Sequence, residues 1–159
     1  MEVSVVAVGK LRSFYREACD EYASRLQRYV TFRELEVREE GREPTMAARQ
    51  SHEAARIEAK LSDPPLTMVA LTRHGSPWSS AELARELERW LVAARPIGFM
   101  IGGSYGLAPR LLENATARWS LGRLTLPHEL ARVVVVEQIY RAFTILRGEP
   151  YHKGSADGS

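Results

Sequence analysis

Residues 119–153 read WSLGRLTLPHELARVVVVEQIYRAFTILRGEPYHK, and this stretch is the most informative part of the sequence. The pattern predicts a short strand at Leu124 to Leu126 and a long helix that opens at Pro127 and ends at Gly148. Within that helix, Val133 to Val136 is apolar on every side. A helix that is apolar all round has to be buried on more than one side. We therefore expect a partner subunit to cover it, with a central helix inside a monomer as the alternative.

Upstream of this stretch, strand and helix patterns alternate along the chain. Strands are predicted at 3–8, 35–37, 66–71 and 97–101, with helices at 13–29, 46–61, 79–94 and from 109 onward. Ser62 to Pro65 is predicted to end the second helix, and Thr72 to Trp78 to form a loop. Alternating strands and helices predict an α/β fold, with a mostly parallel sheet and helices on both faces.

Composition describes an ordinary globular chain of 159 residues, with 45% hydrophobic and 26% charged residues. Residues 1–153 are expected to form a single domain, because no linker or repeat divides them, and 154–159 to form a flexible tail. Cys19 is the one cysteine, which excludes an intrachain disulfide and favours a cytoplasmic location. No apolar run reaches the roughly 20 residues that span a bilayer, so no membrane contact is expected. A net charge of +2 does not by itself predict nucleic-acid binding.

A glycine-rich loop, Gly102-Gly103-Ser104-Tyr105-Gly106, follows the fourth predicted strand. Glycines let a ligand approach the backbone closely, although such a loop can equally be a simple turn. A dinucleotide-binding fingerprint would follow the first strand and have an acid about 20 positions later, where this chain has Arg123. A phosphate-binding P-loop would continue with Gly-Lys-Ser/Thr, which is absent here. Both of those nucleotide-binding classes are therefore excluded.

The segment from Gly122 to His128 and the glycine loop both adjoin the carboxyl ends of predicted strands. Open α/β sheets bind ligands at that edge. Two further groups could carry chemistry or contact RNA. Tyr151-His152-Lys153 offers a stacking ring, an imidazole and a cation, or else a frayed terminus. Glu137 and Arg141 share a helix face and could form a site pair or an ordinary surface pair. The histidines and the single cysteine show no metal-ligand spacing, so no metal is expected.

Three stretches, taken together, resemble one family. They are 101–107, 124–128, and 136–142 with 151–153. The family is that of the bacterial 23S rRNA pseudouridine N3-methyltransferases, the RlmH family, a minimal group within the SPOUT class. The opening 5–10 and the middle 76–84 are also similar to it, so the likeness covers residues 1–153 in order and spacing. Many members have Pro-Glu where this chain has Ser104-Tyr105, so no acid is available in that loop here.

The resemblance implies a C-terminal trefoil knot, a homodimer, S-adenosylmethionine as the methyl donor, and a pseudouridine of 23S rRNA in the assembled ribosome as the substrate. Carried onto this chain, the donor contacts fall on Leu71, Gly102, Gly103, Gly122, Arg123, Leu124, Thr125, Leu126 and Pro127. Alternatives are a SPOUT methyltransferase acting on another rRNA or tRNA nucleotide, and a non-catalytic dimer that binds the ribosome.

Methylation of N3 requires the loss of an imide proton, so a base or a hydrogen-bond acceptor is needed near it. We assign contact with the base, or assistance in proton loss, to His152. Tyr151 and Lys153 are expected to place the nucleotide, and Arg141 to hold a phosphate or an imide oxygen. Glu137 is expected to orient Arg141.

Overall fold

The strands form one parallel sheet in the order β2-β1-β4-β3-β5, and the computed structural model describes residues 1–61 and 66–153. The strands are β1 (Glu2–Val8), β2 (Thr31–Val37), β3 (Thr67–Ser76), β4 (Ile97–Ile101) and β5 (Ala117–Trp119). The helices are α1 (Ser13–Leu26), α2 (Met46–Lys60), α3 (Ser80–Val92), α4 (Pro109–Asn114) and α5 (His128–Leu146). This confirms the predicted α/β class.

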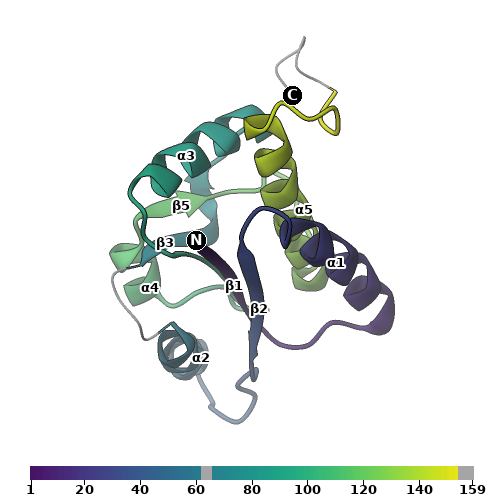
Figure 1. The fold of residues 1–159 in the computed structure, drawn as a ribbon. Helices are drawn as coiled ribbons and strands as arrows, with labels where there is room; N and C mark the ends of the chain where they lie inside the picture. Colours follow the sequence, from purple (N-terminus) through teal and green to yellow (C-terminus); the bar gives the residue numbers. More distant parts are fainter. Residues whose placement is uncertain (62–65, 154–159) are drawn as a thin grey trace.

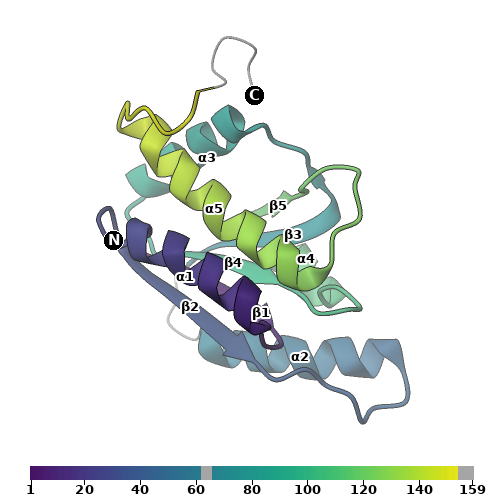
Figure 2. The ribbon, with the colours of Figure 1, turned by 90° about the vertical axis from the view of Figure 1, so that its right-hand side faces the viewer.

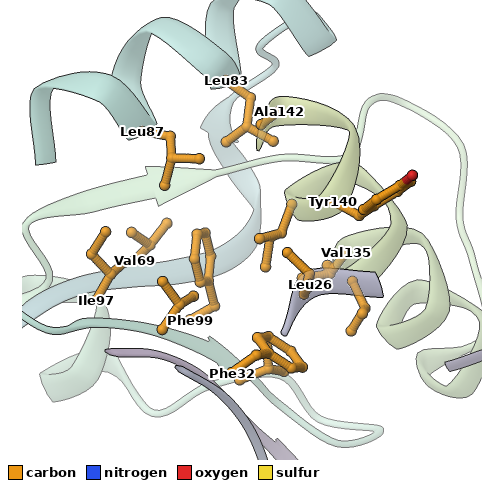
Figure 3. Close-up of a cluster of buried hydrophobic side chains, with 14 of the residues drawn as sticks. Leu26, Phe32, Val69, Leu83, Leu87, Ile97, Phe99, Val135, Tyr140 and Ala142 are labelled. Atoms are coloured by element: carbon orange, nitrogen blue, oxygen red, sulfur yellow. The ribbon is translucent and has the colours of Figure 1, made fainter. Parts of the chain in front are cut away.

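Helices cover both faces of the sheet, as predicted (Figures 1 and 2). Because side chains alternate along a strand, β1 sends Val3 and Val5 to one face and Val6 and Val8 to the other. The first face packs against α1, α3 and α5, and Figure 3 shows a cluster of the apolar side chains buried there. The second face packs against α2 and α4. The sheet is therefore buried on both sides, as a parallel sheet requires.

The predicted strand at 124–126 is wrong. The edge strand next to β3 is instead β5, and Leu124 is 80% exposed in the loop that leads to α5. The loop predicted at 72–78 is also largely wrong, because β3 runs on to Ser76 through an irregular stretch. Ser79 caps α3, since its hydroxyl accepts a hydrogen bond from the Glu82 amide at 3.1 Å. Each prediction on 62–65 and 154–159 lies outside the described residues.

Helix α5 lies over the sheet between α1 and α3, which contact it along its two sides (Figure 2). Its core side chains, such as Val135, Val136 and Ile139, are fully buried within one chain. One chain therefore buries the core side of this apolar helix by itself, as the monomer alternative allows, and this burial gives no argument for a partner subunit. Val133 and Val134 stay half-buried. The homodimer remains a proposal on other grounds.

A buried arginine fixes the start of α5 to the sheet. Arg132 is 1% exposed and donates to the Gly9 carbonyl at 2.9 Å, just after β1. Its other terminal nitrogen meets Glu34 at 3.1 Å and Glu36 at 2.5 Å, both on β2. The carboxylates compensate the buried charge, which would otherwise be very costly. This anchor holds the start of α5 beside the carboxyl end of β1 and against β2. No helix of the described chain is long and apolar enough to cross a membrane.

Candidate active site

A pocket of about 480 Å³ lies at the carboxyl ends of β3 and β4. Three segments line it: 71–74 of β3, 101–107 with the glycine loop, and 119–128 before α5. Most of the predicted donor-binding residues lie in its wall, namely Leu71, Gly102, Gly103, Gly122, Leu124, Thr125 and Leu126. The structure thus brings together two loops that are about 20 residues apart in the sequence. Arg123 lies instead in an adjoining hollow, and Pro127 lines neither space.

The glycine loop folds tightly back on itself. Gly103 and Gly106 form an antiparallel bridge, with the Gly106 amide donating to the Gly103 carbonyl at 3.0 Å. A Cβ atom on Gly102 would stand 2.5 Å from the Gly106 carbonyl carbon, so no larger residue fits this turn. Helix α2 holds the loop from outside, because Arg49 and Gln50 donate to the hydroxyl and carbonyl oxygens of Tyr105 at 2.8 and 2.6 Å.

Apolar surface predominates in the pocket wall, and no aspartate or glutamate of the described chain lines it. Its ionisable side chains are Tyr105 of the glycine loop, Arg73, His74 and His128, and the last three were not among the predicted donor residues. Their positions directly after a buried strand and directly after Pro127 were the available signal. No group of three or more His, Cys, Asp or Glu in the described part of the chain could hold a metal.

The predicted catalytic and RNA-contacting residues form a second cluster at the far end of α5. Arg141 donates to Glu137 Oε1 from Nε at 2.9 Å and from Nη2 at 2.6 Å. The Tyr151 hydroxyl donates to the same oxygen at 3.3 Å, and the Arg141 guanidinium lies 4.8 Å from the Tyr151 ring centre. Burial and the nearby Glu137 carboxylate raise the pKa of Tyr151, which stays a neutral phenol. The structure thus joins Glu137, Arg141, Tyr151 and His152 into one group, the Glu137 cluster, while Lys153 is exposed.

The hydrogen bond between His152 and Arg141 defines the tautomer of the imidazole. Arg141 Nη1 lies 3.1 Å from His152 Nδ1. A guanidinium can only donate, so Nδ1 accepts and the proton of the neutral ring sits on Nε2. Nε2 is buried and has no hydrogen-bond partner among the described residues. In this arrangement His152 offers a donor rather than a free acceptor.

Within one chain, the Glu137 cluster is separated from the pocket. Ala131 is the last residue of α5 that lines the pocket, and Arg141 lies ten residues further along the helix. At 1.5 Å per residue, that spacing corresponds to roughly 15 Å. None of the residues Glu137, Arg141, Tyr151 and His152 lines the pocket.

Comparison with known proteins gives a consistent result. The family described as "Predicted SPOUT methyltransferase" matches residues 1–152. A protein of Anaeromyxobacter sp. named ribosomal RNA large subunit methyltransferase H is 46% identical, over 96% of this chain and all of its own length. A protein of the same name from Pseudomonas putida is 41% identical over the same shares.

Two solved structures resemble the fold at low sequence identity. A probable methyltransferase from Bordetella pertussis has a TM-score of 0.56 and 15% identity, over 88% of this chain and 93% of its own. A probable methylase family protein from Haemophilus influenzae has a TM-score of 0.52 and 12% identity, over 95% of this chain and 70% of its own. Matched from residue 1 to 152 and 46% identical to a relative over nearly its whole length, the chain belongs to the SPOUT methyltransferases and, within them, to the RlmH family.

Proposed function

We propose that the chain methylates N3 of a pseudouridine in 23S rRNA of the assembled ribosome, with S-adenosylmethionine as the methyl donor. The observation that carries this proposal is the convergence of the glycine loop and the 119–128 segment on one pocket at the carboxyl edge of the sheet. The printed names of the relatives, ribosomal RNA large subunit methyltransferase H, support the substrate class. The proposal also places the enzyme in the cytoplasm, where ribosomes assemble.

The pocket fits the donor by size and by chemistry. Small-molecule sites have volumes of about 300–1,000 Å³, and this one measures about 480 Å³. Leu71, Leu121 and Leu126 offer apolar surface to an adenine ring, while the tight glycine loop brings backbone groups within reach of polar atoms. When bound, S-adenosylmethionine would supply an activated methyl group and a thioether leaving group. Leu71, Gly102, Gly103, Gly122 and the segment Leu124 to Leu126 remain our proposed donor residues because they line the pocket, whereas Arg123 lines the adjoining hollow.

The Glu137 cluster is proposed to hold the nucleotide. Glu137 fixes the Arg141 guanidinium, which can donate to a phosphate or to an imide oxygen of the base. Tyr151 offers a ring for stacking, and Lys153 a cation for the RNA backbone. If Arg141 turns toward the substrate, it releases His152 Nδ1, which then has a free lone pair for the N3 proton. The reaction forms the N3–methyl bond as the carbon–sulfur bond breaks.

The distance between the pocket and the cluster favours a homodimer. Reacting atoms have to come within about 3–3.5 Å, whereas the cluster lies roughly 15 Å along α5 from the pocket in one chain. We propose that a second copy brings its own Glu137 cluster to the pocket of the first. The half-buried Val133 and Val134 offer apolar surface on α5 for such a contact. The trefoil knot implied by the resemblance remains a prediction.

Methyl transfer to defined substrates tests the proposal. With a net charge of only +2, the chain has little general attraction for RNA, so recognition should depend on the shape of the assembled ribosome. We expect purified protein and labelled S-adenosylmethionine to methylate ribosomes that lack the modification, and to methylate naked 23S rRNA poorly. Equal rates on the two substrates would contradict the role of the assembled ribosome. Transfer to tRNA alone would contradict the proposed substrate.

A further inference from the structure

A second hollow, of about 600 Å³, adjoins the donor pocket. It shares Arg73, His74, Ser120 and Gly122 with the lining of that pocket, and it adds Arg123. The two spaces therefore meet along the same pair of loops. Arg73 and Arg123 come from segments about 50 residues apart in the sequence, and the fold brings both to this hollow.

A bulge in β3 presents Arg73. Leu71 and Ser76 both pair with Trp119 of β5, so residues 72–75 form an irregular excursion between them. A Cβ atom on Gly75 would lie 2.6 Å from the backbone of β5, so this glycine packs directly against the neighbouring strand. Bulges beside active sites redirect a side chain. Here the bulge directs Arg73 to the rim of the donor pocket, where its side chain is exposed.

A fixed turn presents Arg123. Gly122 has a φ of +113°, which favours glycine at this position. The Ser120 hydroxyl accepts from the Gly122 amide at 3.1 Å and closes the turn. The Ser120 amide donates to the Ser76 carbonyl at 2.9 Å and so ties this turn to the end of β3. Both arginines therefore extend from backbone that is already held in place before any ligand arrives.

These two arginines are uncompensated within the described residues. Neither takes part in an ion pair or a side-chain hydrogen bond there, whereas Arg16, Arg110 and Arg141 are all paired with glutamates. Among residues 1–61 and 66–153, no aspartate or glutamate lines the hollow or the donor pocket. A concave site with charge of one sign attracts ligands of the other sign. Guanidinium groups bind phosphate through paired hydrogen bonds.

We propose that Arg73 and Arg123 bind a phosphodiester group of the rRNA strand beside the target nucleotide, at the mouth of the donor pocket. This inference rests on the proposed function and names residues for its substrate. The alternative ligand for these arginines is the carboxylate of S-adenosylmethionine, which is also an anion. A phosphodiester fits better, because the hollow adds about 600 Å³ to a pocket that already has the volume for the donor. Both arginines are also exposed, as contact with an RNA strand requires.

The test compares two double variants that remove the same charge. R73Q/R123Q changes the hollow, and R85Q/R95Q changes two exposed arginines that line neither space. Ribosome binding is measured by co-sedimentation in a salt series from about 50 to 200 mM at fixed magnesium, and donor binding by calorimetry. We expect R73Q/R123Q to weaken ribosome binding by about tenfold or more. The salt slope should fall by about 0.7 for each lost phosphate contact. R85Q/R95Q should stay close to wild type, and R73K/R123K should recover part of the loss.

Donor binding separates the two possible anions. An unchanged dissociation constant for S-adenosylmethionine in R73Q/R123Q supports the phosphodiester, whereas a marked weakening would assign the arginines to the donor and overturn the proposal. Equal losses of ribosome affinity in the two double variants would also overturn it. Ribosome binding does not depend on catalysis. A wild-type chain that binds ribosomes through these arginines without methylating them would contradict the proposed function and leave this inference standing.

Discussion

Substitution of Gly102 by alanine should weaken donor binding while leaving the fold in place. The added Cβ would lie 2.5 Å from the Gly106 carbonyl carbon and 2.8 Å from the Leu107 nitrogen. Ordinary contact begins at 3.4 Å, so backbone on the far side of the turn has to move by about 1 Å. That movement disrupts the Gly106–Gly103 hydrogen bond, worth about 1 kcal/mol. A misplacement of about 1 Å in a binding site can cost up to about a hundredfold.

Calorimetry with S-adenosylmethionine measures this effect. We expect G102A to bind the donor at least about tenfold more weakly, and its stability in urea to fall by about 1–3 kcal/mol. Gly41→Ala is the matched control, because a Cβ there meets nothing within 4 Å. It should change neither quantity. Donor affinity in G102A within a factor of about two of wild type would refute the assignment of the glycine loop to the donor site.

Three further outcomes are expected. R132M should lose about 1.5–3 kcal/mol in urea denaturation, because it removes charged hydrogen bonds to Glu34 and the Gly9 carbonyl while Glu34 keeps its pair with Arg16. The exposed R89M should lose at most about 0.5 kcal/mol. Burial alone would raise the pKa of Glu34, but hydrogen bonds from two arginines outweigh it and lower the pKa below 4.5. Glu34 therefore contributes to the free energy of unfolding at neutral pH, and this contribution is lost as the pH falls through the lowered pKa. Acid titration of unfolding should show this loss in wild type and not in E34Q. Burial raises the pKa of Cys19 to about 12, so its thiol should react with iodoacetamide at pH 8 only after unfolding.

The sequence predicted the layers of the fold better than its edges. Strands β1 and β4 are nearly continuous apolar runs, and such runs in a parallel sheet are buried on both faces. β5 escaped prediction because it has three residues and pairs on one side only, so its pattern carries little periodicity. Leu124 to Leu126 has the composition of a strand, yet it forms the wall of a pocket. Composition alone could not distinguish a leucine-rich strand from a leucine-rich loop that lines a pocket.

The site was predictable in its parts but not in their arrangement. The glycine loop and the segment before α5 were found because loops at the carboxyl edge of a parallel sheet converge. Arg73 and His74 were missed because a bulge, rather than a regular strand, directs them to the pocket. The tautomer of His152 follows only from its contact with Arg141, which no sequence spacing reveals. The separation of the Glu137 cluster from the pocket likewise needed the path of α5.

The proposed function is tested most directly by nucleoside mass spectrometry of 23S rRNA and tRNA from a strain that lacks the protein. We predict that one N3-methylated pseudouridine disappears from 23S rRNA and returns when the gene is restored, while tRNA nucleosides stay unchanged. Restoration with G102A should fail to return it. An unchanged 23S profile, or the loss of a methylated nucleoside from tRNA instead, would contradict the proposal.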